Sequence, residues 1–191
     1  TYGKYLFRDK AVLPVMTYSE VQFMKAEAAL RKSNPALAYT AYTEGIKGHF
    51  AFINRSSFPR SNVTIYNGAT ISTARINTYM AGPNVKQTAA ALTLSDIMQQ
   101  KYIALWGWGY VETWTDMRKY HYTDLDPVTG LQVYKDLVMP TVFFADNGGP
   151  NYAYRVRPRY NSEYVWNRDA LNTFGGLDPD YHTKKTWAIL P

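Results

Sequence analysis

Residues 16–46, "MTYSEVQFMKAEAALRKSNPALAYTAYTEGI", hold two helix-start signals and decide the fold. Thr17 and Glu20 have the T-x-x-E spacing of a capping box, in which both side chains bind free backbone N–H groups at a helix start. Asn34 followed by Pro35 is a second start, because Asn is a good N-cap and Pro tolerates the first helical position. The stretch therefore predicts two helices joined by a short turn, which is a helical hairpin.

The first helix, expected at about 19–32, is apolar on two sides. At 100° per residue, Val21 and Met24 share one side, whereas Phe23 and Ala26 lie nearly opposite. The second helix adds a stripe of small residues that permits close helix approach: Ala38, Ala41, Gly45 and Gly48. Helices that are apolar on two sides stack between neighbours, as in helical-repeat arrays, although no clean internal repeat is visible here.

Further helices are expected outward from this hairpin. Residues 54–82 have a polar composition and are expected to form a long loop that leads into a short helix at about 74–80. Thr93 with Asp96 forms another capping box, which is expected to start a unit of two helices separated by a break. The helical period stops near residue 123, and Gly and Pro breaks then predict loops with short extended pieces. One modest helix is expected at 161–172. The fold class is mostly α: stacked hairpins with a loop-rich irregular portion.

Composition narrows the class of protein. The 191 residues suffice for a single domain, expected over 1–191, and the absence of Cys excludes disulfides and thiolate metal sites. The net charge of +6 is spread along the chain without a basic cluster, so nucleic-acid binding is not expected. No uninterrupted run of about 18 apolar residues is present, so no membrane-spanning segment is expected.

Metal and cofactor sites are not expected. The three histidines lie far apart and outside any metal-binding spacing. The segment from Asp124 resembles the start of a calcium loop, but Val128 stands where a fifth-position oxygen ligand is needed. Calcium binding through Asp124 and Asp126 is the minor alternative.

No catalytic residue is predicted. Glu112 and Asp116 are four positions apart on one helix, which is compatible with an acid/base pair. Arg118 and Lys119 lie beside them, however, and an ion-pair cluster explains this pattern better. A glycosidase needs two carboxylates facing each other across a cleft, and one helix face does not provide that.

Aromatic residues in loops are the best candidates for ligand contact. The chain has 17 Tyr and 5 Trp, and a Tyr ring joins an apolar face to a polar tip. Sugar rings pack C–H faces on aromatic planes while their hydroxyls bond to polar neighbours. From a wider group that includes Phe58 and Tyr122, four candidates are selected: Tyr66, Tyr134, Tyr152 and Tyr154. A structural role for each is the alternative.

Three stretches, in order, resemble the SusD/RagB family of Bacteroidetes outer-membrane nutrient-binding lipoproteins. Residues 13–46 resemble its T-Y-x-E, K-A-E-A-A and A-Y-x-x-G-I hairpin, and residues 96–120, "DIMQQKYIALWGWGYVETWTDMRKY", resemble its Q-K-x-I-A-L and G-x-E-x-W stretch. Residues 157–167, "RPRYNSEYVWN", are similar to its R-P-R-Y segment. Lys119 departs from the family, which often has a second Arg there.

The resemblance implies tetratricopeptide-like helix pairs and the C-terminal part of a longer protein. It also implies a lipid anchor that this chain lacks, an extracellular position on the cell outer membrane, and a SusC-like TonB-dependent transporter as partner. The implied function is non-enzymatic capture of an oligosaccharide for uptake. Oligopeptide uptake and a helical-repeat protein-interaction module remain open, and the matching motifs are expected to serve packing and ion pairing.

Overall fold

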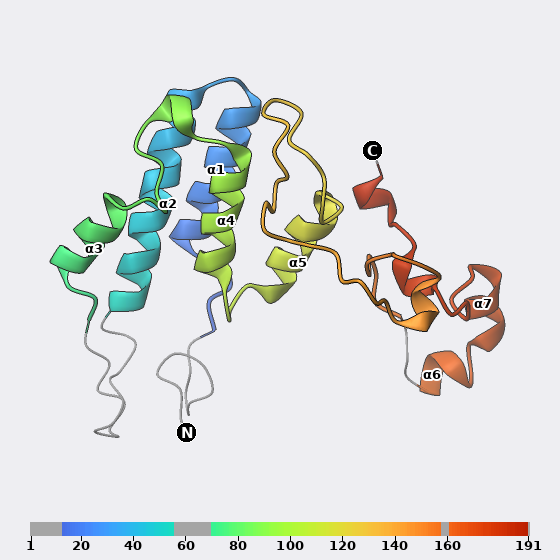
Figure 1. Ribbon diagram of the computed structural model, residues 1–191. Helices are drawn as coiled ribbons and strands as arrows, with labels where there is room; N and C mark the ends of the chain where they lie inside the picture. The colour runs from blue at the N-terminus through green and yellow to red at the C-terminus, as the bar shows by residue number, and fades with distance from the viewer. Residues whose placement is uncertain (1–12, 56–69, 158–160, 191) are drawn as a thin grey trace.

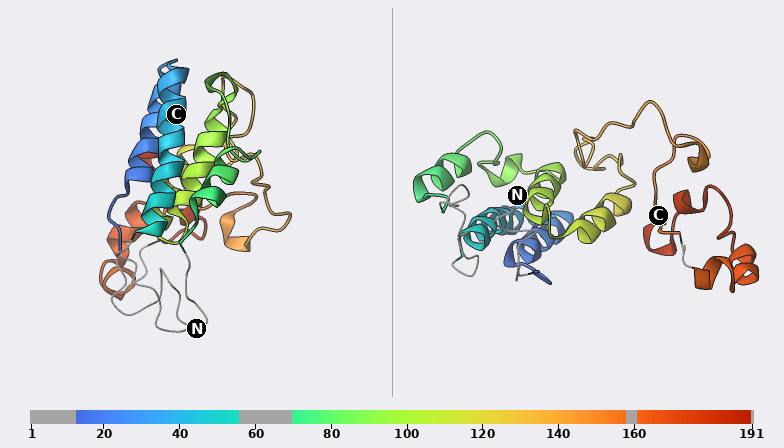
Figure 2. Two further views of the ribbon diagram at one scale, coloured as in Figure 1. Left: turned by 90° about the vertical axis from the view of Figure 1, so that its left-hand side faces the viewer. Right: turned by 90° about the horizontal axis from the view of Figure 1, so that it is seen from below.

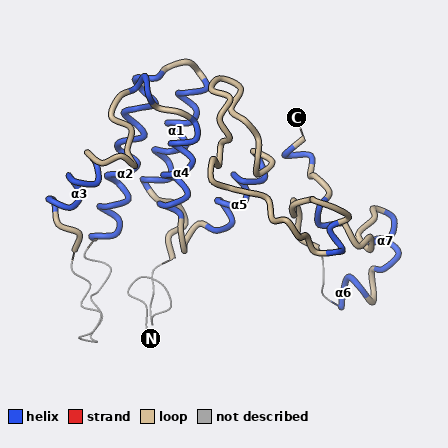
Figure 3. Tube along the Cα trace, in the orientation of Figure 1, coloured by secondary structure: helices blue, strands red, loops and turns tan. Residues whose placement is uncertain are grey.

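The computed structural model describes residues 13–55, 70–157 and 161–190 (Figure 1). The described residues form helices and loops without a strand, as Figure 3 shows. The helices, in chain order, are α1 (Tyr18–Arg31), α2 (Pro35–Asn54), α3 (Thr73–Met80), α4 (Leu94–Leu105), α5 (Tyr110–Lys119), α6 (Asn161–Tyr164) and α7 (Arg168–Thr173). The predicted mostly α fold is confirmed. None of the described helices is long and apolar enough to traverse a bilayer.

Helices α1 and α2 form the predicted hairpin. The Thr17 hydroxyl accepts a hydrogen bond from the Glu20 N–H (3.1 Å), which is one half of the expected capping box. The Asn34 side chain accepts from the Leu37 N–H (3.1 Å) and starts α2 directly after the turn. Both start signals therefore begin a helix as predicted, although only the Thr17 half of the capping box is seen.

Close contact between α1 and α2 depends on glycine. A Cβ at Gly45 would lie 2.9 Å from the Phe23 ring, and a Cβ at Gly48 would lie 2.6 Å from the Tyr18 ring. The Ser19 hydroxyl also donates to the Gly45 carbonyl oxygen (2.7 Å). The predicted small stripe on α2 is thus the surface on which the α1 rings lie.

Helix α4 packs against the α1–α2 hairpin, and the three lie side by side in two views (Figure 2). They share a core with Phe23 and Ala26 fully buried at its centre. Val21 and Met24, on the other side of α1, are 42% and 48% exposed. Among the described residues only one side of α1 is covered, because α2 and α4 both pack there. Residues 13–55, 70–157 and 161–190 therefore do not supply the expected second neighbour.

The second helical unit begins as predicted. The Thr93 N–H donates to Asp96 Oδ2 (2.9 Å) and the Asp96 N–H donates to Thr93 Oγ1 (3.3 Å), a complete capping box. Gly109 then separates α4 from α5, and its hydrogen atom faces Leu105 closely enough to exclude a side chain. The helix-break-helix interpretation is confirmed.

The chain after α5 is irregular, as expected, and lies to one side of the helices (Figure 1). The predicted extended pieces reduce to one isolated bridge between Leu125 and Gln132. The single helix predicted at 161–172 is wrong, because α6 and α7 are separate. Asn167 leaves helical geometry and stands at the N-cap position of α7, a position that favours Asn.

Candidate functional site

A buried carboxylate organises the ends of α1 and α5. Glu27 is 6% exposed and accepts from Lys119 Nζ (2.5 Å), Arg31 Nε (3.2 Å) and the Tyr120 hydroxyl (2.5 Å). Burial alone raises the pKa of Glu27, but the hydrogen bonds and charges of these three partners outweigh it and hold the pKa below its ordinary value. Glu27 is therefore a charged structural anchor.

A second ion pair lies between α4 and α5. Lys101 Nζ is 2.6 Å from Asp116 Oδ2, and both side chains are largely buried. Burial raises the pKa of Asp116, and the charge of Lys101 opposes this rise. Glu112 is exposed and Lys119 pairs with Glu27 instead. The prediction of ion pairs is thus right, but the partners differ: Asp116 pairs with α4 and Lys119 pairs with α1.

The predicted ligand-contact residue Tyr134 lies in the core. Its side chain is 5% exposed and packs with Leu94, Met98 and Val133. The ring meets that of Tyr120 edge to face, with centroids 6.4 Å apart. Burial raises the pKa of Tyr134, so its hydroxyl stays protonated. In this arrangement Tyr134 serves packing, and its ligand contact stays a prediction.

Tyr152 and Tyr154, two further predicted contacts, come together on Tyr122. The Tyr122 and Tyr152 rings stack with centroids 4.3 Å apart, and Tyr154 meets Tyr122 edge to face at 5.5 Å. The Tyr122 hydroxyl accepts from Trp114 Nε1 (2.8 Å) and donates to the Ala153 carbonyl oxygen. The sequence thus predicts two tyrosines that are neighbours in the structure, Tyr152 and Tyr154, but it does not show that Tyr122 lies between them.

Of the candidates described, Tyr152 is the most accessible. Tyr154 is 9% exposed, whereas Tyr152 is only partly buried and carries Phe143 against its ring edge at 6.1 Å. Although the ring is partly exposed, the Tyr152 hydroxyl is itself buried and has no hydrogen-bond partner within the described ranges. Any partner that reaches this hydroxyl therefore relieves an unsatisfied polar group. The candidates Tyr66 and Phe58 lie outside the described residues.

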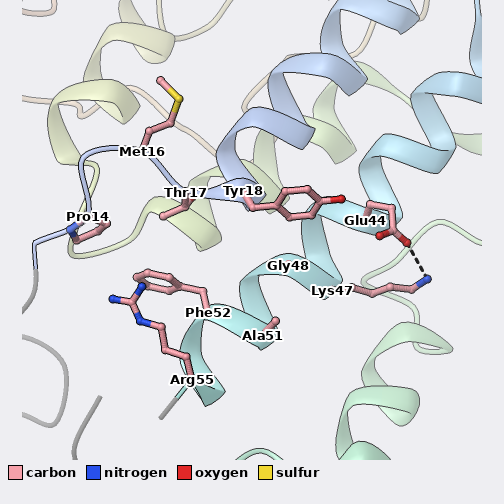
Figure 4. A pocket seen from close by; sticks show the side chains of 10 residues that line it. All are labelled: Pro14, Met16, Thr17, Tyr18, Glu44, Lys47, Gly48, Ala51, Phe52 and Arg55. Carbon is pink, nitrogen blue, oxygen red and sulfur yellow. Dashed lines mark hydrogen bonds and ion pairs between the residues drawn. The ribbon is translucent and has the colours of Figure 1, made fainter. Parts of the chain in front are cut away.

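A cleft that the sequence interpretation missed lies between the lead-in to α1 and the second half of α2 (Figure 4). Its volume is about 590 Å³. The Tyr18 ring, 58% exposed, forms one part of its wall, and the Phe52 ring with the Arg55 guanidinium 4.4 Å above it forms another. The Lys47–Glu44 ion pair (3.1 Å) supplies hydrogen-bonding groups. This mixed apolar and polar lining suits binding of a small ligand.

The sequence contains a weak indication of this cleft. Tyr18 stands at the start of α1 and Gly48 belongs to the small stripe of α2, 30 positions away. Only the antiparallel hairpin brings the two together, and the missing Cβ of Gly48 leaves room for the Tyr18 ring. Helical periodicity identifies the stripe without identifying which ring lies on it.

A second cleft, of about 350 Å³, lies where the loop after α5 meets the C-terminal segment. His121 stands in its wall, with Nδ1 2.7 Å from Asp124 Oδ2 and Nε2 2.8 Å from the Ile189 carbonyl oxygen. Asp126 accepts instead from the Val128 N–H (3.1 Å) and from Thr129 within its own turn. The two aspartates of the calcium alternative therefore serve local bonds, and the described residues contain no metal-ligating cluster of three.

Comparison with known proteins finds one matching family. The SusD-like_2 family model, described as "Starch-binding associating with outer membrane", matches residues 3–143. No curated protein and no solved structure matches the chain. The match covers the hairpin and the α4–α5 unit and ends before the segment that resembles R-P-R-Y. Of that segment, Arg157 donates to the Pro179 carbonyl oxygen (2.6 Å), while residues 158–160 lie outside the described part.

Proposed function

Because the chain belongs to the SusD-like family, we propose that it captures an oligosaccharide at the outer face of the outer membrane. Family membership implies nutrient binding there, in a family of binding proteins rather than enzymes. Delivery to a SusC-like TonB-dependent transporter and attachment through a lipid anchor belong to the proposal. The observation that supports sugar as the ligand is the cleft of about 590 Å³ with aromatic walls.

The cleft matches the two needs of a sugar ligand. A pyranose ring offers apolar C–H faces, which the exposed ring of Tyr18 and the ring of Phe52 can pack against. Its hydroxyls both donate and accept, and Glu44 and Lys47 provide an acceptor and a donor on one edge. A cleft of this volume holds a short stretch of a glycan.

The partly exposed ring of Tyr152 is the second surface that we propose to contact the ligand. Its ring rests on Tyr122, and its hydroxyl lacks a partner within the described residues. A sugar hydroxyl is a suitable partner if the Tyr152 side chain turns, because the hydroxyl itself is buried in this arrangement. Tyr66, Tyr134 and Tyr154 remain proposed contacts, and the burial of Tyr134 and Tyr154 makes them the less accessible ones.

Oligopeptide uptake is the second candidate function. Pro14 and Met16 make part of the same cleft apolar, and Met in particular adapts to varied side chains. The net charge of +6 favours acidic ligands of either class. The ligand panel must therefore contain both classes.

Calorimetric titration of the full chain tests the proposal, with neutral oligosaccharides, acidic oligosaccharides and mixed oligopeptides as separate panels and product analysis of each sample. We expect sugar binding without cleavage. Tyr18→Ala and Tyr152→Ala should each weaken binding about tenfold or more if their rings contact the sugar. Tyr110→Ala is the matched control, because Tyr110 is 75% exposed and lines neither cleft. Binding of peptides alone would replace the glycan proposal with peptide uptake.

A further inference from the structure

His121 lies between two hydrogen-bond acceptors. Its Nδ1 is 2.7 Å from a carboxylate oxygen of Asp124, and its Nε2 is 2.8 Å from the carbonyl oxygen of Ile189. A neutral imidazole carries one N–H, so it donates to one of these oxygens and turns a lone pair toward the other. Only the imidazolium, with two N–H groups, satisfies both oxygens at these distances.

We propose that His121 is a proton-operated clasp that, as an imidazolium, ties the C-terminal segment at Ile189 to the loop at Asp124. Loss of the proton removes one of the two bonds and loosens the segment. The Asp124 bond is charge-assisted in the clasped state and is therefore the stronger of the two. The Ile189 bond is the one expected to open.

The charged groups around His121 come from several elements. Asp124 and Asp126 lie on the same loop as His121, and Lys119 at the end of α5 and Arg31 on α1 line the same cleft. The uncharged Tyr154 ring lies 6.0 Å from the imidazole. The His121 side chain is 19% exposed, so protons reach it without unfolding.

The backbone supports a fixed position for this ring. His121 has φ +42° and the next residue, Tyr122, has φ +65°, a left-handed conformation that L-residues adopt rarely. Two such residues in succession persist when surrounding contacts hold them. The Tyr122 hydroxyl supplies those contacts through its hydrogen bonds with Trp114 and Ala153. These bonds hold the backbone at Tyr122, and so they help to fix the imidazole of His121 beside Ile189.

The clasp has a defined structural consequence. Ile189 and its neighbours Ala188 and Leu190 form one wall of the 350 Å³ cleft. Ile189 is also buried against Tyr122 and Tyr154. It lies outside the segment 3–143 that matches the family, whereas His121 and Asp124 lie within it. Protonation of His121 thus controls how firmly the C-terminal segment is held on the part of the chain that matches the family.

Nuclear magnetic resonance of the full chain tests the proton state directly. We expect both ring nitrogens of His121 to carry protons at about pH 6, with ring ¹⁵N shifts typical of imidazolium. As the pH rises, the amide resonances of residues 187–190 should move together with those ring nitrogens. Amides that stay fixed while His121 titrates, or one unprotonated ring nitrogen at pH 6, would overturn the proposal.

Hydrogen exchange of the C-terminal peptide provides the variant test. His121→Asn removes the imidazole but keeps a residue that tolerates positive φ. We expect exchange about tenfold faster than in the unmodified chain at pH 6, and nearly equal exchange at about pH 8.5. His182→Asn is the control, since only one of its ring nitrogens has a described partner, Asn147 Oδ1 at 2.8 Å. We expect His182→Asn to leave exchange of the C-terminal peptide close to that of the unmodified chain at both pH values. A His121→Asn effect that is equal at both pH values refutes the clasp, and the resonance test above does not depend on this variant folding.

Discussion

Lys119 Nζ lies 2.5 Å from Glu27 Oε1 and joins α5 to α1 across 92 positions of the chain. The same carboxylate accepts from Arg31 and Tyr120, so one buried group connects the hairpin to the end of α5. Lys119 is the residue at which the sequence departs from the related family, and it makes the ion pair nonetheless. Of the quoted motif residues, Glu27 and Lys119 therefore have a structural role in this chain.

Replacing Glu27 should lower the stability of the whole fold. Glu27→Gln keeps the shape but removes the charge that Lys119 and Arg31 face, and we expect the free energy of unfolding to fall by about 1–3 kcal/mol. Glu44→Gln is the control, because the Glu44–Lys47 pair is exposed and should change stability by less than about 0.5 kcal/mol. Urea unfolding measures both. Equal losses of unfolding free energy in the two variants would show that the Glu27 network stabilises the fold no more than an exposed ion pair does.

The pKa shift of Glu27 predicts an acid-sensitive fold. Its pKa is lowered on folding, so its stabilising contribution is present above its unfolded value and is lost as the pH falls through the lower folded value. The unfolding free energy should therefore decrease in acid, below about pH 4.5. This decrease should be smaller in Glu27→Gln, measured as unfolding free energy against pH. An unchanged acid slope would mean that other groups cause it.

Burial of His49 predicts a separate step at higher pH. Desolvation lowers the pKa of His49, so folding favours its neutral form, and that contribution is present above pH 6.5 and lost as the pH falls below it. We expect His49→Leu to destabilise less at pH 5.5 than at pH 7.5, because this variant has no proton to take up. A His49→Leu effect identical at both pH values contradicts this assignment.

Two glycines on one helix stripe should respond differently to alanine. A Cβ at Gly45 meets three ring atoms of the buried Phe23 within 3.0 Å, and overpacking there should cost about 1–3 kcal/mol even after the gain in helix propensity. A Cβ at Gly48 meets Tyr18, whose ring is exposed and can turn aside. We therefore expect Gly48→Ala to be neutral or stabilising by up to about 1 kcal/mol. Thermal unfolding of the pair checks the difference, and equal melting temperatures would refute it.

The local signals in the sequence predicted the helices well. Asn34 starts α2 and Thr93 with Asp96 starts α4, because capping is a contact within four residues and needs no knowledge of the fold. The ion pairs were predicted with the wrong partners, since Lys101 and Asp116 meet only after α4 and α5 pack. Burial depends on such packing as well.

The position of a tyrosine in a loop therefore does not predict how accessible its side chain is. Tyr134 and Tyr152 both follow the last long helix in segments without helical period, yet Tyr134 is enclosed and Tyr152 is not. The difference arises because Tyr134 packs in a core cluster with Val133, Tyr120 and residues of α4, whereas Tyr152 stacks on the ring of Tyr122. The cleft beside Tyr18 was missed for the same reason, since both walls come from different helices.

The hydroxyls of Tyr152 and Tyr122 give the sharpest contrast for mutation. Tyr152→Phe removes a hydroxyl without a partner among the described residues, so we expect stability to stay equal or rise by up to about 1 kcal/mol. Tyr122→Phe removes a hydroxyl that accepts from Trp114 and donates to Ala153, which leaves both unsatisfied and should cost about 1–3 kcal/mol. Urea unfolding measures the two, and oligosaccharide titration of Tyr152→Phe then separates structure from binding. Weaker sugar binding at unchanged stability would show that a ligand supplies the partner the Tyr152 hydroxyl lacks. Unchanged binding would leave the cleft beside Tyr18 as the better-supported contact surface.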